Sequence, residues 1–339
     1  MIYLKHKLIK NWWQATRYHF IPPSIFPVCI GALVSWARYN QLSIWFFFLV
    51  LFAVVVNHIA LNMTDDYFDF KHAVDNLKPG EKNPYTGGSG VLTSSLIKPQ
   101  QMFRCFILLY SITVIIGLYL VFTIDFIIII FGLIGVFSSI FYTAPPIRFS
   151  HYGLGEIGML INFGSVLGLG SFFVQAKMIS WEAFFATLPC GIMLFSMIIV
   201  NEIPDIKEDT QSGKLTLIAR YGPQFGIKLF IVSWIATYSV IILGMFLTIL
   251  PIYLVFTLLS LPFVLRSIRG LKKHYDDPKL LAPANLDMIR SHSFVCLLIL
   301  AGYSILGFLN NSNMFVLLGF FVIVCVFYIP AVVTTFRLK

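Results

Sequence analysis

The sequence predicts an all-α, polytopic membrane protein built as a bundle of transmembrane helices. Of its 339 residues, 58% are hydrophobic and only 12% are charged, whereas soluble proteins carry roughly 45–50% apolar and about 25% charged residues. The mean hydropathy is +0.85, and the apolar residues gather in stretches near the length of about 20 residues that crosses a hydrocarbon core of about 30 Å. This composition excludes a water-soluble protein, a disordered chain and a nucleic-acid-binding module.

Ten apolar stretches are expected to span the membrane, namely 21–37, 42–62, 102–121, 126–144, 154–175, 183–201, 226–247, 250–265, 292–309 and 314–334. Pro251 divides the seventh from the eighth, because proline removes a backbone donor and commonly starts a new helix. The basic and aromatic N-terminus is typical of a helix at the membrane surface. We therefore expect an interfacial segment 1–20, a bundle 21–309 and an extra C-terminal span 310–339.

Positive charge orients the bundle. With a cytoplasmic N-terminus, all of the 24 lysines and arginines except Arg38 and Lys177 fall on the cytoplasmic side, and such an excess marks cytoplasmic loops. We therefore expect a multi-pass protein of the cell membrane, surrounded by the lipid bilayer. Its N-terminus and its two long polar loops, 65–100 and 202–225, face the cytoplasm.

Acidic residues gather on that same side, where the second span runs into 62–69 (NMTDDYFD) and the sixth into 201–209 (NEIPDIKED). If each helix continues, residues four apart share one face: Asp65 with Asp69, and Asn201 with Asp205 and Asp209. Neighbouring carboxylates repel each other, and charge near hydrocarbon needs a partner. No comparable row of Lys or Arg lies on those helix faces, so we predict Mg²⁺, which prefers oxygen ligands. Together with Asn62, these five residues are the predicted metal ligands.

Ordinary solvated helix ends are the alternative interpretation, because charged side chains normally collect at span boundaries. A single acidic motif would fit that alternative. Two motifs at the same membrane face, each preceded by an asparagine, favour a metal site.

Further segments surround the two motifs: 83–90 (NPYTGGSG), 142–148 (YTAPPIR) and 213–217 (GKLTL). With the motifs they resemble the UbiA superfamily of intramembrane aromatic prenyltransferases, and most closely its 1,4-dihydroxy-2-naphthoate polyprenyltransferase branch. The resemblance implies nine core spans. Asp65 departs from it by standing where the family has Asn, and Pro204 by standing where related sequences often carry Arg. We expect Pro204 to kink the sixth helix.

The resemblance implies transfer of a polyprenyl group from an allylic polyprenyl diphosphate to an aromatic acceptor. In the branch that fits best, the acceptor is 1,4-dihydroxy-2-naphthoate and CO₂ is lost, as in menaquinone biosynthesis. Bound Mg²⁺ would stabilise the leaving diphosphate. The candidate residues are Lys82, Arg148 and Lys214 for the diphosphate, Tyr142 for the allylic cation, and Asp66 and Asp75 for the acceptor phenol.

Two alternatives remain at this stage. Another UbiA-type enzyme with a different acceptor would keep the same motifs, although the acid at Asp75, in place of one at Ala73, favours the naphthoate branch. A transporter would also place acids within a helical bundle, but usually in mid-span and with an inverted repeat.

Overall fold

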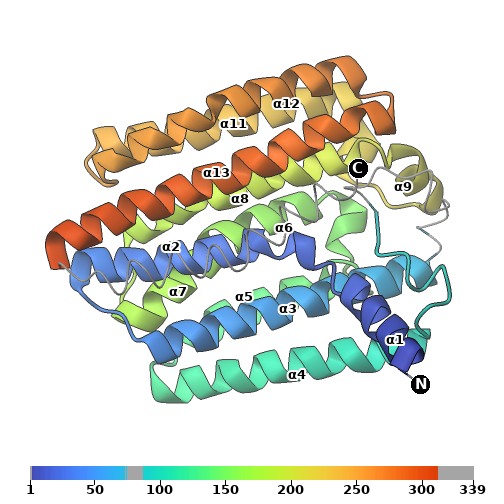
Figure 1. The fold of residues 1–339 in the computed structure, drawn as a ribbon, viewed down its shortest axis with the longest axis horizontal. Coiled ribbons are helices and arrows are strands. Elements are labelled where there is room, and N and C mark those ends of the chain that lie inside the picture. Colours follow the sequence, from blue (N-terminus) through green and yellow to red (C-terminus); the bar gives the residue numbers. More distant parts are fainter. Residues whose placement is uncertain (1, 73, 75–86, 312–339) are drawn as a thin grey trace.

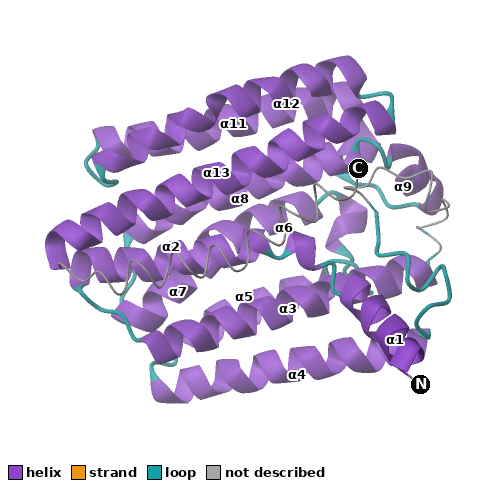
Figure 2. Cartoon of the chain, viewed as in Figure 1, coloured by secondary structure: helices purple, strands orange, loops and turns teal. Residues whose placement is uncertain are grey.

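The computed structural model describes residues 2–72, 74 and 87–311, which form a bundle of long helices lying side by side (Figure 1). No strand occurs within those ranges, and helices joined by loops make up the structure (Figure 2). Asp75, Lys82 and the predicted tenth span lie outside the described residues. The all-α prediction is confirmed.

The elements follow one another along the chain as α1 (Ile2–Ala15), η1 (Tyr18–Phe20), α2 (Pro22–Tyr39), α3 (Ile44–Lys71), α4 (Pro99–Thr123), α5 (Ile128–Phe141), η2 (Phe149–Tyr152), α6 (Gly155–Ile161), η3 (Asn162–Val166), α7 (Leu167–Ala176), α8 (Trp181–Glu202), α9 (Ile206–Ser212), α10 (Leu217–Tyr221), α11 (Pro223–Phe246), η4 (Ile252–Ser260), α12 (Leu261–His274) and α13 (Pro278–Asn311). The short π-helix η3 joins α6 and α7 into one span of 22 residues.

Each of the first nine predicted spans coincides with helical structure. Within the described residues, seven helices are long and apolar enough to cross a membrane, and eight if α1 and α2, bent by 54° between Phe20 and Pro22, count as one span. At 14 residues, α5 measures about 21 Å and is shorter than the others. As predicted, Pro251 separates α11 from the next span, which begins as the 3₁₀ helix η4.

Close packing holds α2, α7 and α8 together. A Cβ atom on Gly31 of α2 would overlap the carbonyl oxygen of Gly168 in α7, and one on Gly191 of α8 would overlap that of Leu160 in α6. Small residues allow such close approach between membrane helices, where packing replaces the hydrophobic effect as the driving force. The backbones of α2, α6, α7 and α8 are therefore in close contact, and these helices form the tightly packed side of the bundle.

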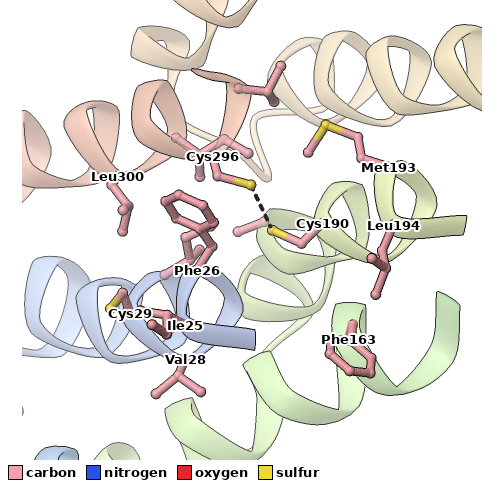
Figure 3. Close-up of a cluster of buried hydrophobic side chains, with 14 of the residues drawn as sticks. Ile25, Phe26, Val28, Cys29, Phe163, Cys190, Met193, Leu194, Cys296 and Leu300 are labelled. Carbon is pink, nitrogen blue, oxygen red and sulfur yellow. Dashed lines mark hydrogen bonds between the residues drawn. The ribbon is translucent and has the colours of Figure 1, made fainter. Parts of the chain in front are cut away.

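The core continues where α2, α8 and α13 meet (Figure 3). Phe26 projects from α2 toward Cys190 of α8 and Cys296 of α13, whose thiol sulfurs lie 3.6 Å apart. Both cysteines are free and fully buried. Residues from the three helices thus fill this space. The C-terminal ends of α3 and α8, which carry the two acidic segments, lie at the end of the bundle marked by α1 and α9 (Figure 1).

Candidate active site

The first acidic segment lies on the C-terminal part of α3. At 28 residues, α3 measures about 42 Å, so it extends beyond a hydrocarbon core of about 30 Å. The helix continues through Lys71, and the prediction that Asp65 and Asp69 share one helix face is therefore confirmed. Asp66 and Asp69 are buried, and Asp65 is partly exposed.

Arg17 reaches this segment from the bend between α1 and α2. Its guanidinium donates to Oδ2 of Asp65 at 3.0 Å and lies 3.5 Å from Oδ1 of Asp66. It also donates to the carbonyl oxygen of Gly87 at 3.1 Å and stacks over Phe20, 5.0 Å from the ring centroid. Charge-assisted bonds of this kind are stronger than neutral ones. No sequence pattern connects Arg17 with Asp65, because the two residues are separated by 48 positions.

Lys214 reaches the same segment from the loop between α9 and α10. Gly213 ends α9 in the left-handed region at φ 78°, where glycine is unstrained, and the chain then turns back. The Lys214 ammonium lies 3.0 Å from Oδ2 of Asp69. Burial opposes its charge, but the carboxylates of Asp69 and Asp209 outweigh that effect and raise the pKa of Lys214 well above its usual value.

Two hydrogen bonds hold the loop that carries Lys214. The backbone N–H of Leu217 donates to Oε1 of the buried Glu156 at 2.6 Å, and the N–H of Leu215 donates to the carbonyl oxygen of His151 at 3.1 Å. Thr216 accepts from the N–H of Ala219 and caps α10. The loop is thereby fixed to η2 and to the first turn of α6.

The second acidic segment is not one helix. As expected from Pro204, α8 ends at Glu202, and α9 begins at Ile206 with Asp205 as its N-terminal cap. The prediction that Asn201, Asp205 and Asp209 share the face of a continuous helix is therefore wrong. Proline cannot donate the backbone hydrogen bond that a continuing helix requires. Asp209 is buried and Asp205 is partly exposed.

The asparagines of the two motifs line one cavity of about 150 Å³. Asn62 donates to the carbonyl oxygen of Thr16 at 3.0 Å, and Asn201 accepts from the side-chain amide of Asn285 at 2.8 Å. The polar lining residues include Arg17, Asn62, Asp65, Tyr142 and Asn201, and the apolar ones include Phe20, Met159, Phe163, Leu194 and Met197. Four of the predicted site residues thus meet at one cavity.

The other predicted residues within the described ranges do not line that cavity. The carboxylate of Asp66 accepts from both the backbone N–H and the hydroxyl of Ser89, a contact that sequence patterns could not indicate. Arg148 contacts Nε2 of His72 at 2.8 Å. Over the described ranges no three His, Cys, Asp or Glu side chains form a cluster that could hold a metal ion. However, Oδ1 of Asp65 is buried and accepts no hydrogen bond from any described residue.

Comparison with known proteins places this arrangement in a family. Residues 24–289 match the UbiA prenyltransferase family, which covers more than half of the chain. The chain belongs to the UbiA prenyltransferase family. The protein is accordingly a UbiA-type prenyltransferase, a membrane-embedded transferase.

Several proteins are similar to the chain over most of its length. A 1,4-dihydroxy-2-naphthoate octaprenyltransferase of Bacillus subtilis is 27% identical over 76% of this chain and 81% of its own length. A 2-carboxy-1,4-naphthoquinone phytyltransferase of Synechocystis is 22% identical over 88% of this chain and 94% of its own. Among solved structures, a UbiA homologue of Archaeoglobus fulgidus bound to GPP and Mg²⁺ superposes with a TM-score of 0.63 at 15% identity, covering 89% of this chain and 100% of that one. The similarity to solved structures confirms the fold.

Proposed function

We propose that this UbiA-type enzyme transfers a polyprenyl group from an allylic diphosphate to 1,4-dihydroxy-2-naphthoate, with loss of CO₂, at the cytoplasmic face of the cell membrane. The observation that carries the proposal is the cavity between α3 and α8, whose lining combines an acidic and a basic side chain, Asp65 and Arg17, with many apolar ones. A diphosphate linked to a hydrocarbon chain has the same two-part character. We infer the acceptor from the names of two relatives, a 1,4-dihydroxy-2-naphthoate octaprenyltransferase and a 2-carboxy-1,4-naphthoquinone phytyltransferase.

The donor set fits Mg²⁺. Carboxylate and amide oxygens are its usual protein ligands, and the buried Oδ1 of Asp65 accepts no hydrogen bond from the described residues. Bound Mg²⁺ would neutralise the negative charge that develops on the leaving diphosphate. The residues that would hold it are Asn62, Asp65, Asp69, Asn201, Asp205 and Asp209.

Arg17 and Lys214 supply fixed positive charge beside those carboxylates. Each lies 3.0 Å from an aspartate oxygen, and each has further N–H donors that a diphosphate oxygen could accept. We assign both to the diphosphate, together with Arg148 and with Lys82, which lies outside the described residues. Positive charge placed before the reaction stabilises the leaving group without reorganisation.

Tyr142 and the apolar walls protect the allylic cation. The C–O bond to the diphosphate breaks, and its electron pair leaves on oxygen. The Tyr142 ring lines the cavity next to Phe163 and Met159, where an aromatic face attracts a cation and water is excluded.

The acceptor then forms the new C–C bond at the ring carbon that carries the carboxylate. CO₂ leaves, and its bonding electrons return to the ring. We assign Asp66, or Asp75 outside the described residues, to the phenol proton. Asp66 is buried next to Arg17 and Ser89, so its charge is balanced within the protein.

A direct assay tests the proposal. Purified protein in lipid vesicles is incubated with a polyprenyl diphosphate and a panel of aromatic acids, with Mg²⁺ or with EDTA, and the products are identified by mass. We expect a Mg²⁺-dependent prenylated naphthalene whose mass shows that the carboxyl group is lost. A product that keeps the carboxyl group, or a product formed only from a benzoate, would show that the proposed acceptor is wrong. The absence of any prenylated product would refute the activity.

A further inference from the structure

One face of α3 borders three neighbouring cavities, of which the first is the acidic site. Its residues Asp65, Leu61, His58, Val54 and Val50 recur every three or four positions and therefore share one side of the helix. Asp65, Leu61 and His58 line the acidic cavity, while His58 and Val54 line a second cavity of about 40 Å³. Val54 and Val50 line a third cavity of about 280 Å³. From Asp65 to Val50 this face of α3 is about 22 Å long.

The small middle cavity lies between the other two and shares lining residues with both, and we call it the neck. Tyr142 and Phe163 line both the neck and the acidic cavity, and Asn57 and Gly135 line both the neck and the third cavity. Asn57 donates to the Ser139 hydroxyl at 2.7 Å on the side of α5. A chain that extends from the acidic cavity along this face of α3 would therefore pass the neck before it reaches the third cavity.

The third cavity is an apolar groove between α3, α4, α5 and α7, which we call the α5 groove. Gly117 of α4 and Gly132 and Gly135 of α5 line it, and a Cβ atom on any of the three would meet nothing within 4 Å. These glycines differ from Gly31 and Gly191, where a Cβ atom would overlap a neighbouring backbone. Close packing therefore does not explain them, and their effect is to keep the groove wide.

We propose that the α5 groove takes the far end of the donor's polyprenyl chain, and that Gly135 and Gly132 set the longest chain that the enzyme accepts. The inference rests on the proposed function, because a diphosphate held near Asp65 directs its hydrocarbon along the apolar walls toward the neck. Hydrocarbon is the chemistry that such a groove accommodates. Gly135 lines both the neck and the groove, whereas Gly132 lies one turn away and lines only the groove.

Side chains added at the two glycines test the order of these positions. Gly135→Leu and Gly132→Leu are compared with the parent protein in vesicles, using allylic diphosphates of increasing length and one fixed acceptor. The matched control is Ile134→Phe, which enlarges an exposed side chain on α5 that lines none of the three cavities. Thermal unfolding in detergent shows that each variant is folded.

We expect Gly135→Leu to lower kcat/KM for long donors by about tenfold or more, since filling occupied space is costly, and to leave the shortest donor nearly unaffected. Gly132→Leu should also lower activity with long donors. The shortest donor that it excludes should be longer than the shortest donor that Gly135→Leu excludes. Ile134→Phe should match the parent at every length.

Two results would overturn the inference alone. One is an equal loss with every donor length in the glycine variants, which would make the glycines structural. The other is no loss with any donor, which would leave the groove to membrane lipid. A parent protein that transfers no donor at all would instead overturn the proposed function, and this inference with it.

Discussion

The first acidic segment lies on one unbroken helix, whereas the second is divided between α8 and α9. On α3, the carboxylates of Asp65 and Asp69 are held at one helix face, and Arg17 and Lys214 each contact one of them. In the second segment, the turn at Pro204 separates Asn201 from Asp205 and Asp209. Two motifs with the same residue spacing thus have different backbones. In the first segment, one helix and two cations hold the carboxylates of Asp65 and Asp69 in place. In the second segment, α9 and not α8 sets the positions of Asp205 and Asp209.

The largest expected effect is loss of one carboxylate from either segment. Asp69→Asn and Asp205→Asn should each lower kcat by about 10²–10³-fold, as removal of a preorganised electrostatic group typically does. The exposed Asp276 supplies the control, Asp276→Asn, which should retain full activity. Prenyl transfer is measured in vesicles at saturating donor. Full activity of Asp69→Asn would remove the first segment from the site, and full activity of Asp205→Asn the second.

Lys214 connects the two segments, and its replacement should have the next largest effect. Lys214→Met leaves Asp69 without the ammonium 3.0 Å away, and we expect kcat/KM to fall by about ten- to a hundredfold. Lys214→Arg keeps the charge and should recover most of the activity. Equal losses in the two variants would show that the shape of the loop, and not its charge, is what matters.

The sequence predicts most of the fold because hydropathy and charge report directly on membrane spans. Nine predicted spans coincide with helical structure, and the breaks at Pro204 and Pro251 follow from the chemistry of proline. The sequence also predicts that Asn62, Asp65, Asn201 and Tyr142 belong to one site, since all four stand at span ends on the same side of the membrane. The four residues line one cavity. Local spacing cannot show which distant cations meet those ends. The absence of Lys and Arg from the acidic faces suggested a metal ion alone, yet Arg17 and Lys214 reach them through tertiary contacts.

Arg17 contacts Asp65 and Asp66 of the first segment, so its replacement should change metal binding there. Arg17→Gln removes the guanidinium that occupies Oδ2 of Asp65, and a divalent ion then no longer competes with it for that oxygen. We expect Mn²⁺, used as a probe for Mg²⁺, to bind the donor-free protein more tightly by about tenfold. Electron paramagnetic resonance measures free Mn²⁺ directly, without turnover. Unchanged or weaker Mn²⁺ binding would mean that Arg17 does not compete for the site.

Pro204→Ala should remove the difference between the segments at a smaller cost. Without the proline, α8 can continue toward α9, which would rotate Asp205 and Asp209 onto a regular helical repeat. We expect kcat to fall several-fold while the Asp69–Lys214 pair remains. The Lys214→Met substitution serves as the internal reference: it should still reduce activity by the same factor in the Pro204→Ala background. Full activity of Pro204→Ala would show that the broken helix is not needed.

The smallest expected effect concerns pH, through the support of the Lys214 loop. Burial, together with the positive charges of Lys214 and Arg148, lowers the pKa of His151 to about 4, so the unfolded chain binds more protons between pH 6.5 and pH 4. Folding stability should therefore be present in full above pH 6.5 and decline as the pH falls through that range. His151→Gln keeps a polar side chain that does not titrate, and its melting temperature should decline less between pH 7 and pH 5 than that of the parent protein. Since the His151 carbonyl accepts from Leu215, the parent should also lose activity in parallel at pH 5. Identical pH profiles for the two proteins would show that His151 is not the titrating group in that range.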